Sequence, residues 1–149
     1  YNCIDFLLGN GSPISETWGN NALYEAIRKD FETLRGKRTN EQLVADLKAV
    51  GRTEGWTLYQ VGSVSDILES MTGIDMPLGA GHCGFKETKL PDGTTILRHV
   101  NYWESRLPNK EFFAETLDGA ASNSESYQMM KRFFPNAVAT VHKIIGSRL

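Results

Sequence analysis

Hydrophobic residues recur at helical spacing through the first third of the chain. One stretch repeats apolar side chains every three or four positions: Ala22, Leu23, Ala26, Ile27, Phe31 and Leu34. This period predicts an amphipathic helix within a stretch that begins at Ser15 and Glu16 and ends near Gly36. Thr39 and Gln42 then have the spacing of a capping box, in which each residue satisfies a backbone donor of the other. A second helix is therefore expected to begin after Thr39 and to end at Gly51.

The central part of the chain changes from helical to strand-like patterning. Residues 55–63, GWTLYQVGS, are predicted to form a short strand, and Ser63 is predicted to cap a third helix that ends at Gly73. Residues 82–103 then contain two β-rich runs separated by Pro91-Asp92-Gly93. A turn sequence of this kind between two such runs predicts a β-hairpin.

The last third of the chain alternates apolar and polar segments. The sequence predicts helical structure at residues 112–117, a polar loop at 119–125 and a short helix through Met129 and Phe133. Residues 137–145, AVATVHKII, are rich in β-branched side chains and are predicted to form a strand. The order of elements indicates an α+β fold, with N-terminal helices followed by a small antiparallel sheet.

The predicted hairpin places polar side chains near His82, because side chains alternate between the two faces of a strand. A two-residue turn pairs positions of opposite parity, so His82 would lie opposite residue 101 or 103. His99, Asn101 and Trp103 would then share its face. A three-residue turn would reverse this arrangement.

Cys3 and His82 are the candidate reactive pair. Cys3 precedes the apolar residues Ile4, Phe6, Leu7 and Leu8 and is predicted to stand at the start of a short buried helix. A helix N-terminus and a neighbouring imidazolium both lower a thiol pKa, which a nucleophilic cysteine requires. The imidazole in turn needs a polar partner that fixes its tautomer, and either His99 or Asn101 is expected to supply it.

These segments resemble the NlpC-type branch of the papain-like cysteine peptidases and amidases. The resemblance rests on YNCIDFLL at residues 1–8, GHCGF at 81–85 and LRHVN at 97–101. It implies a papain-like fold and a thiol-dependent amide hydrolase, with Trp103 and Tyr1 contacting a peptide or amide substrate. It further implies an antibacterial effector or toxin that is secreted or translocated into a target cell. Its substrate would be the cell-wall peptide of peptidoglycan, and an immunity protein is an expected partner.

The overall composition agrees with a single catalytic domain over residues 1–149, either complete or a fragment of a longer chain. The 16 basic and 18 acidic side chains give a net charge of −2, so no nucleic-acid partner is expected. No apolar run approaches the ~18 residues of a membrane-spanning helix, so we expect a soluble chain without a membrane partner. Cysteines and histidines lack metal-ligand spacing, so neither a metal nor a cofactor is expected.

Two alternatives remain from other classes of protein. The first is a ribonuclease toxin that uses His82 and His99 as acid and base, with Arg98 or Lys86 on the phosphate. The second is a non-catalytic interaction module in which the two cysteines of the chain form a disulfide. Reactivity of Cys3 distinguishes both alternatives from a thiol hydrolase.

Overall fold

Eight helices and one hairpin make up the part of the chain that the structure describes. The computed structural model describes residues 2–76, 78–79, 81–104, 107–122 and 124–148, without the side chains of residues 2, 3 and 124. The helices before the hairpin are α1 (Asn2–Leu8), α2 (Ile14–Thr17), α3 (Ala22–Arg35), α4 (Asn40–Glu54) and α5 (Leu58–Thr72). The hairpin consists of β1 (Phe85–Lys89) and β2 (Thr95–His99). The helices that follow are α6 (Asn109–Ser122), α7 (Ser124–Phe133) and α8 (Pro135–Gly146).

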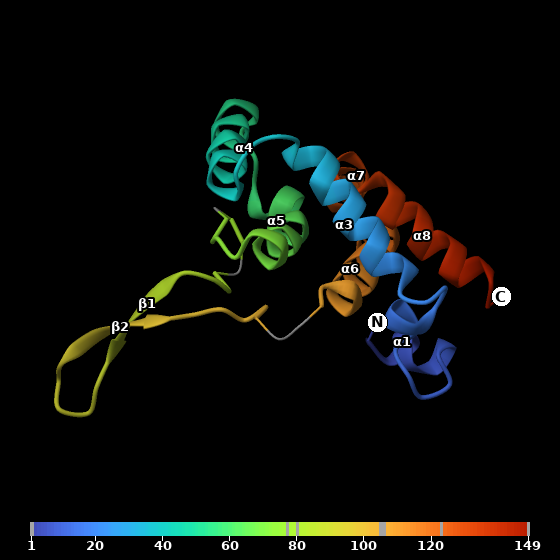
Figure 1. Cartoon of the computed structure of the whole chain (residues 1–149), viewed down its shortest axis with the longest axis horizontal. Helices are drawn as coiled ribbons and strands as arrows, with labels where there is room; N and C mark the ends of the chain where they lie inside the picture. The colour runs from blue at the N-terminus through green and yellow to red at the C-terminus, as the bar shows by residue number, and fades with distance from the viewer. Residues whose placement is uncertain (1, 77, 80, 105–106, 123, 149) are drawn as a thin grey trace.

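The helices form the body of the molecule, and the hairpin extends away from them (Figure 1). Helix α3 packs along α8, and α5 packs against α7, so helices from both halves of the chain share one core. Fully buried members of that core are Ile14, Leu23, Ile27, Leu43, Ile67, Phe112, Phe113, Met130, Phe134, Ala137, Val141 and Ile144. The fold is thus mostly helical with a small two-stranded antiparallel sheet, which agrees with the α+β prediction.

Helices continue through segments that the sequence predicted to be strand or loop. Residues 55–63 are not a strand, because Thr57 and Gln60 form a capping box that starts α5. Ser63 therefore lies inside that helix instead of capping it. Gly51 does not end α4, which runs on to Glu54. The stretch predicted to begin at Ser15 is divided, because α2 ends at Thr17 and α3 begins at Ala22. The predicted ends at Gly36 and Gly73 are confirmed as the C-caps of α3 and α5.

The C-terminal segments also differ from their predictions. Helices α6 and α7 occupy the described residues of the predicted loop at 119–125. Residues 137–145 form most of α8 instead of a strand. The β-branched side chains there are compatible with a helix because Val138, Val141 and Ile144 recur on one buried face.

Helix α1 is present as predicted, but the side chains that it buries are different. Ile4 is 36% exposed and Leu7 is 75% exposed, whereas Asp5 is only 1% exposed. The Asp5 carboxylate accepts hydrogen bonds from the Ser15 backbone N–H at 2.7 Å and from its hydroxyl at 2.6 Å. This carboxylate, which the sequence does not distinguish from a solvated charge, therefore fixes α1 against α2.

The hairpin is confirmed, but its predicted register is wrong. Phe85 pairs with His99, and the Leu90 N–H donates to the Thr94 carbonyl at 2.7 Å, so three residues form the turn. Gly93 adopts φ 88°, a conformation that a three-residue turn requires at its last position and that glycine adopts without strain. Directly opposed residues are consequently both odd-numbered or both even-numbered. The residues of β2 therefore lie on the opposite face from the one that the two-residue turn predicted.

Among the described residues, none of the helices combines the length and the apolar character needed to cross a membrane.

Candidate functional site

A buried glutamate on α5 organises the segment that leads into the hairpin. Glu69 has no exposed surface, and its two carboxylate oxygens accept the backbone N–H groups of Met76 at 3.1 Å and His82 at 3.2 Å. A Cβ atom at Gly79 would lie 2.2 Å from Glu69 Oε1, so only glycine fits there without displacing the carboxylate. Burial raises the pKa of Glu69, and the two backbone donors oppose that shift.

Two aromatic rings hold the imidazole of His82 beside α5. Its ring centroid lies 4.5 Å from that of Tyr102 and 5.5 Å from that of Trp103. The Tyr102 N–H donates to the His82 carbonyl at 2.9 Å, which continues the hairpin ladder beyond β1. The rings therefore fix the imidazole so that Nδ1 faces the carboxylates of Asp66 and Glu69.

Asp66, Glu69 and His82 together form a three-residue cluster of metal-ligand type. His82 Nδ1 lies 4.0 Å from Asp66 Oδ1 and 4.0 Å from Glu69 Oε2, and all three ligand atoms lie within 4.8 Å of one another. Nδ1 is buried and has no hydrogen-bond partner among the described residues. Ligand atoms of a tetrahedral ion with ~2.1 Å bonds lie about 3.4 Å apart, so small rotations of these side chains would close the set.

An acidic cavity adjoins this cluster through Asp66. It encloses about 420 Å³, and Ser63, Glu115 and Asp118 also line it. The Ser63 hydroxyl donates to Glu115 Oε2 at 2.6 Å. Burial raises the pKa of Glu115, repulsion from Glu111, Asp66 and Asp118 adds to the rise, and the Ser63 hydrogen bond opposes it. A raised pKa makes a carboxyl a stronger base and so a better candidate for proton transfer.

Cys83 is a buried free thiol whose environment suppresses its reactivity. Its backbone N–H donates to Asp75 Oδ1 at 2.6 Å, and its sulfur lies 3.6 Å from the Glu69 carbonyl oxygen that it can donate to. Burial raises the pKa of the thiol to about 11, and the charges of Glu69 and Asp75 contribute to that rise. The free thiol also removes the disulfide on which the interaction-module alternative depends.

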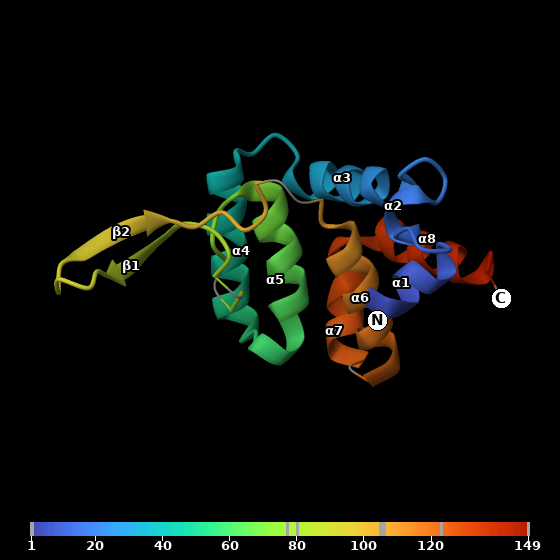
Figure 2. The ribbon, with the colours of Figure 1, turned by 90° about the horizontal axis from the view of Figure 1, so that it is seen from below.

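The structure does not place the helix that carries Cys3 beside His82. The side chain of Cys3 and the whole of Tyr1 lie outside the described residues, but α1 is described and packs against α2 and α6. Figures 1 and 2 both show α1 at the far side of α6 from the base of the hairpin. His82, in contrast, lies against α5.

His99 and Asn101 were predicted to lie beside His82 on the assumption of a two-residue turn, and that assumption is wrong. His99 is exposed on β2, where its ring lies 5.3 Å from that of Phe85, the residue it pairs with. Asn101 is not the cross-strand neighbour of His82, because Tyr102 occupies that place. Trp103 does contact His82, but it is 6% exposed and packs inward.

The sequence interpretation missed Asp66 and Glu69, which are the closest acidic partners of His82. Their separation of three positions puts both carboxylates on one face of a helix. That spacing alone is common on solvated helices. The two carboxylates become a candidate site only because the loop after α5 brings His82 back against this helix.

Comparison of the sequence with protein-family models found no match, and searches among curated proteins and solved structures likewise returned no significant similarity.

Cys3 should react with limiting iodoacetamide at neutral pH well before Cys83. The raised pKa and complete burial of Cys83 keep it protonated and inaccessible, whereas Cys3 lies at the N-terminus of α1. Mass mapping after a short exposure measures both sites in one sample. In unfolded protein the two cysteines should label at similar rates, which serves as the control. Equal labelling in the folded protein would contradict this prediction.

Proposed function

We propose that the chain hydrolyses amide or peptide bonds with the help of a divalent transition-metal ion bound by Asp66, Glu69 and His82. The observation that carries the proposal is the buried His82 Nδ1 that faces two carboxylate oxygens at equal distances of 4.0 Å. Two carboxylates and one imidazole suit Zn²⁺ or Mn²⁺ better than Mg²⁺ or Ca²⁺, which prefer oxygen ligands alone.

An ion held by Asp66, Glu69 and His82 would supply Lewis-acid chemistry and would make water a stronger nucleophile toward an amide carbonyl carbon. Hydrolysis breaks the C–N bond, and the leaving amine takes up a proton. Glu115 lines the cavity that Asp66 also lines, and its raised pKa suits it to receive the proton of the water and to pass one to the amine.

The charge of the cavity supports amides over phosphodiesters as the substrate class. Glu115 and Asp118 line the cavity outside the proposed ligand set, and their charges favour a neutral group or an amine over a phosphate. The ribonuclease alternative also needs His99 near His82, whereas His99 packs on Phe85 in the hairpin. Bacterial cell-wall peptide stays the leading amide substrate of the proposal, with delivery as a secreted or translocated effector and an immunity protein as the partner.

A papain-like thiol mechanism leads to cleavage of the same bond, and it stays a prediction. It requires the Cys3 sulfur to reach the His82 imidazole, which the packing of α1 against α2 and α6 does not favour. The two mechanisms differ in what inactivates them. A Cys3→Ala variant keeps full activity in the metal mechanism and loses it in the thiol mechanism.

Metal binding by chelator-treated protein tests the proposal directly. Titration calorimetry with Zn²⁺ and with Mn²⁺ should give a 1:1 complex, and Asp66→Asn and His82→Gln should each weaken it by at least about tenfold. His99→Gln is the matched control, because it removes an exposed imidazole outside the cluster. Equal affinity in His82→Gln and in the unsubstituted protein would contradict the proposal.

Amine release from peptide substrates provides the second measurement. Chelator should abolish the release, added metal should restore it, and Cys3→Ala should leave it unchanged. If activity survives chelation but disappears in Cys3→Ala, the metal mechanism is contradicted and the thiol mechanism is supported.

A further inference from the structure

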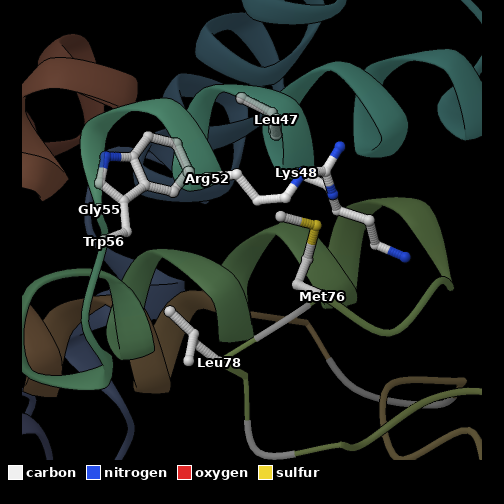
Figure 3. Close-up of a pocket in the computed structure, with 8 residues that line it drawn as sticks. Leu47, Lys48, Arg52, Gly55, Trp56, Met76 and Leu78 are labelled. Atoms are coloured by element: carbon white, nitrogen blue, oxygen red, sulfur yellow. The ribbon is translucent and has the colours of Figure 1, made fainter.

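A second cavity lies between α4 and the segment that follows α5. It encloses about 480 Å³, which falls in the size range of small-molecule sites. Four apolar side chains and two basic side chains line it: Leu47, Trp56, Met76, Leu78, Lys48 and Arg52. Figure 3 shows the two basic side chains on α4, facing Met76 and Leu78 across the cavity, with Trp56 at one end. The α4 side of the cavity thus carries both cations, and the opposite side, with Met76 and Leu78, is apolar.

The indole of Trp56 is fixed in place as the end wall of this cavity. A Cβ atom at Gly51 would lie 2.7 Å from Trp56 Cε3, so glycine inside α4 lets the ring lie directly against the helix backbone. On its other side, the ring meets Phe133 edge-on at 5.8 Å between centroids, and the Arg132 guanidinium lies 5.9 Å from its centroid. Glycine within a helix costs about 1 kcal/mol relative to alanine, and here it preserves the wall.

Lys48 and Arg52 bring two positive charges to one face of α4 without a neutralising group. Within the described ranges, neither side chain forms a hydrogen bond or an ion pair, whereas Arg38, just before α4, pairs with Asp46 at 2.8 Å. Residues four apart on a helix are neighbours, so these like charges repel one another. An anion between them would relieve that repulsion.

We propose that this cavity binds a small organic anion that has an apolar body and a single carboxylate. Leu47, Met76 and Trp56 hold the apolar body, and Lys48 and Arg52 bind the carboxylate. The site is distinct from the proposed hydrolytic centre, because its charged residues are basic and those of the cavity at Asp66 are acidic. Leu78 lines both cavities and separates the two sites.

Three probes of equal chain length test the charge preference: octanoate, octan-1-ol and octylamine. In titration calorimetry, octanoate should bind at least about tenfold more tightly than octan-1-ol or octylamine, because only its carboxylate is attracted by the two cations. The double variant Lys48→Gln/Arg52→Gln should lose that advantage. Lys29→Gln/Lys37→Gln removes two exposed positive charges outside the cavity and should bind octanoate unchanged.

Fluorescence locates the probe. 2-Bromooctanoate should quench the emission of the folded protein, and the quenching should disappear in Trp56→Phe, because bromine quenches only a nearby indole. Circular dichroism of that variant confirms that it is folded. Three results would overturn the proposal: equal affinity for all three probes, unchanged octanoate binding in Lys48→Gln/Arg52→Gln, or quenching that persists in folded Trp56→Phe.

Discussion

Replacement of Glu69 by alanine should lower the free energy of unfolding by about 3 kcal/mol, because two buried backbone donors lose their acceptor. The N–H groups of Met76 and His82 both donate to this carboxylate, which has no exposed surface. The substitution also leaves a cavity where the carboxylate filled the space beside Gly79. Urea denaturation followed by circular dichroism measures the change.

One further variant removes the charge of Glu69 but keeps one acceptor, and a second variant serves as a surface control. Glu69→Gln keeps one carbonyl oxygen and should cost less than Glu69→Ala, because one of the two donors retains an acceptor. Glu87→Ala removes an exposed glutamate from β1 and should change stability by less than about 0.5 kcal/mol. Stability of Glu69→Ala within that same margin would show that the carboxylate does not anchor the segment.

Asp30→Ala should be the second most damaging single substitution, with a loss of about 2 to 3 kcal/mol in the free energy of unfolding. Asp30 lies on α3 and is 3% exposed, yet its carboxylate accepts the Ala137 N–H at 2.9 Å and the Asn136 side-chain amide at 2.7 Å. Its charge also faces the positive end of the α8 dipole. Phe134, the N-cap residue of α8, supplies no side-chain hydrogen bond, so Asp30 caps α8 from another helix.

Asp46→Ala is the matched control for Asp30→Ala. Asp46 pairs with Arg38 at 2.8 Å on the surface, where its side chain is 57% exposed, and exposed pairs contribute at most about 1 kcal/mol. Equal losses in the two variants, measured by urea denaturation under the same conditions, would refute the role of Asp30 as a cap.

Local signals in the sequence were sufficient for the helices whose ends are set by neighbouring residues. The capping box of Thr39 and Gln42 and the glycine after α5 are contacts between residues close in the chain, so they can be identified without a structure. The strand prediction at residues 137–145 was wrong because contacts with residues distant in the chain determine this segment. Packing of α8 along α3 and capping by Asp30 outweigh the weak β preference of valine and isoleucine.

The candidate site was predictable only in part. The glycines around His82 indicated a close approach, and the structure places the imidazole against two carboxylates and two aromatic rings. Asp66 and Glu69 were missed because a buried acid and a solvated acid look the same in one sequence. Pairing through a three-residue turn in place of a two-residue turn puts Tyr102 opposite His82, so His99 and Asn101 do not share its face of the hairpin.

The exposure of the hairpin leads us to expect that it opens more easily than helices α3 and α8. Most side chains of β1 and β2 are exposed, and Phe85 and Leu97 retain 68% and 67% of their surface. A two-stranded hairpin without a packed face has little stability of its own, so its amide hydrogens exchange with solvent through local fluctuations. Helices α3 and α8 bury their apolar faces in one core, and their amides exchange only when that core opens. His82 lies where these two regions meet, so the exchange rate of its amide, which donates to Glu69, should report whether the hairpin opens independently of the helices.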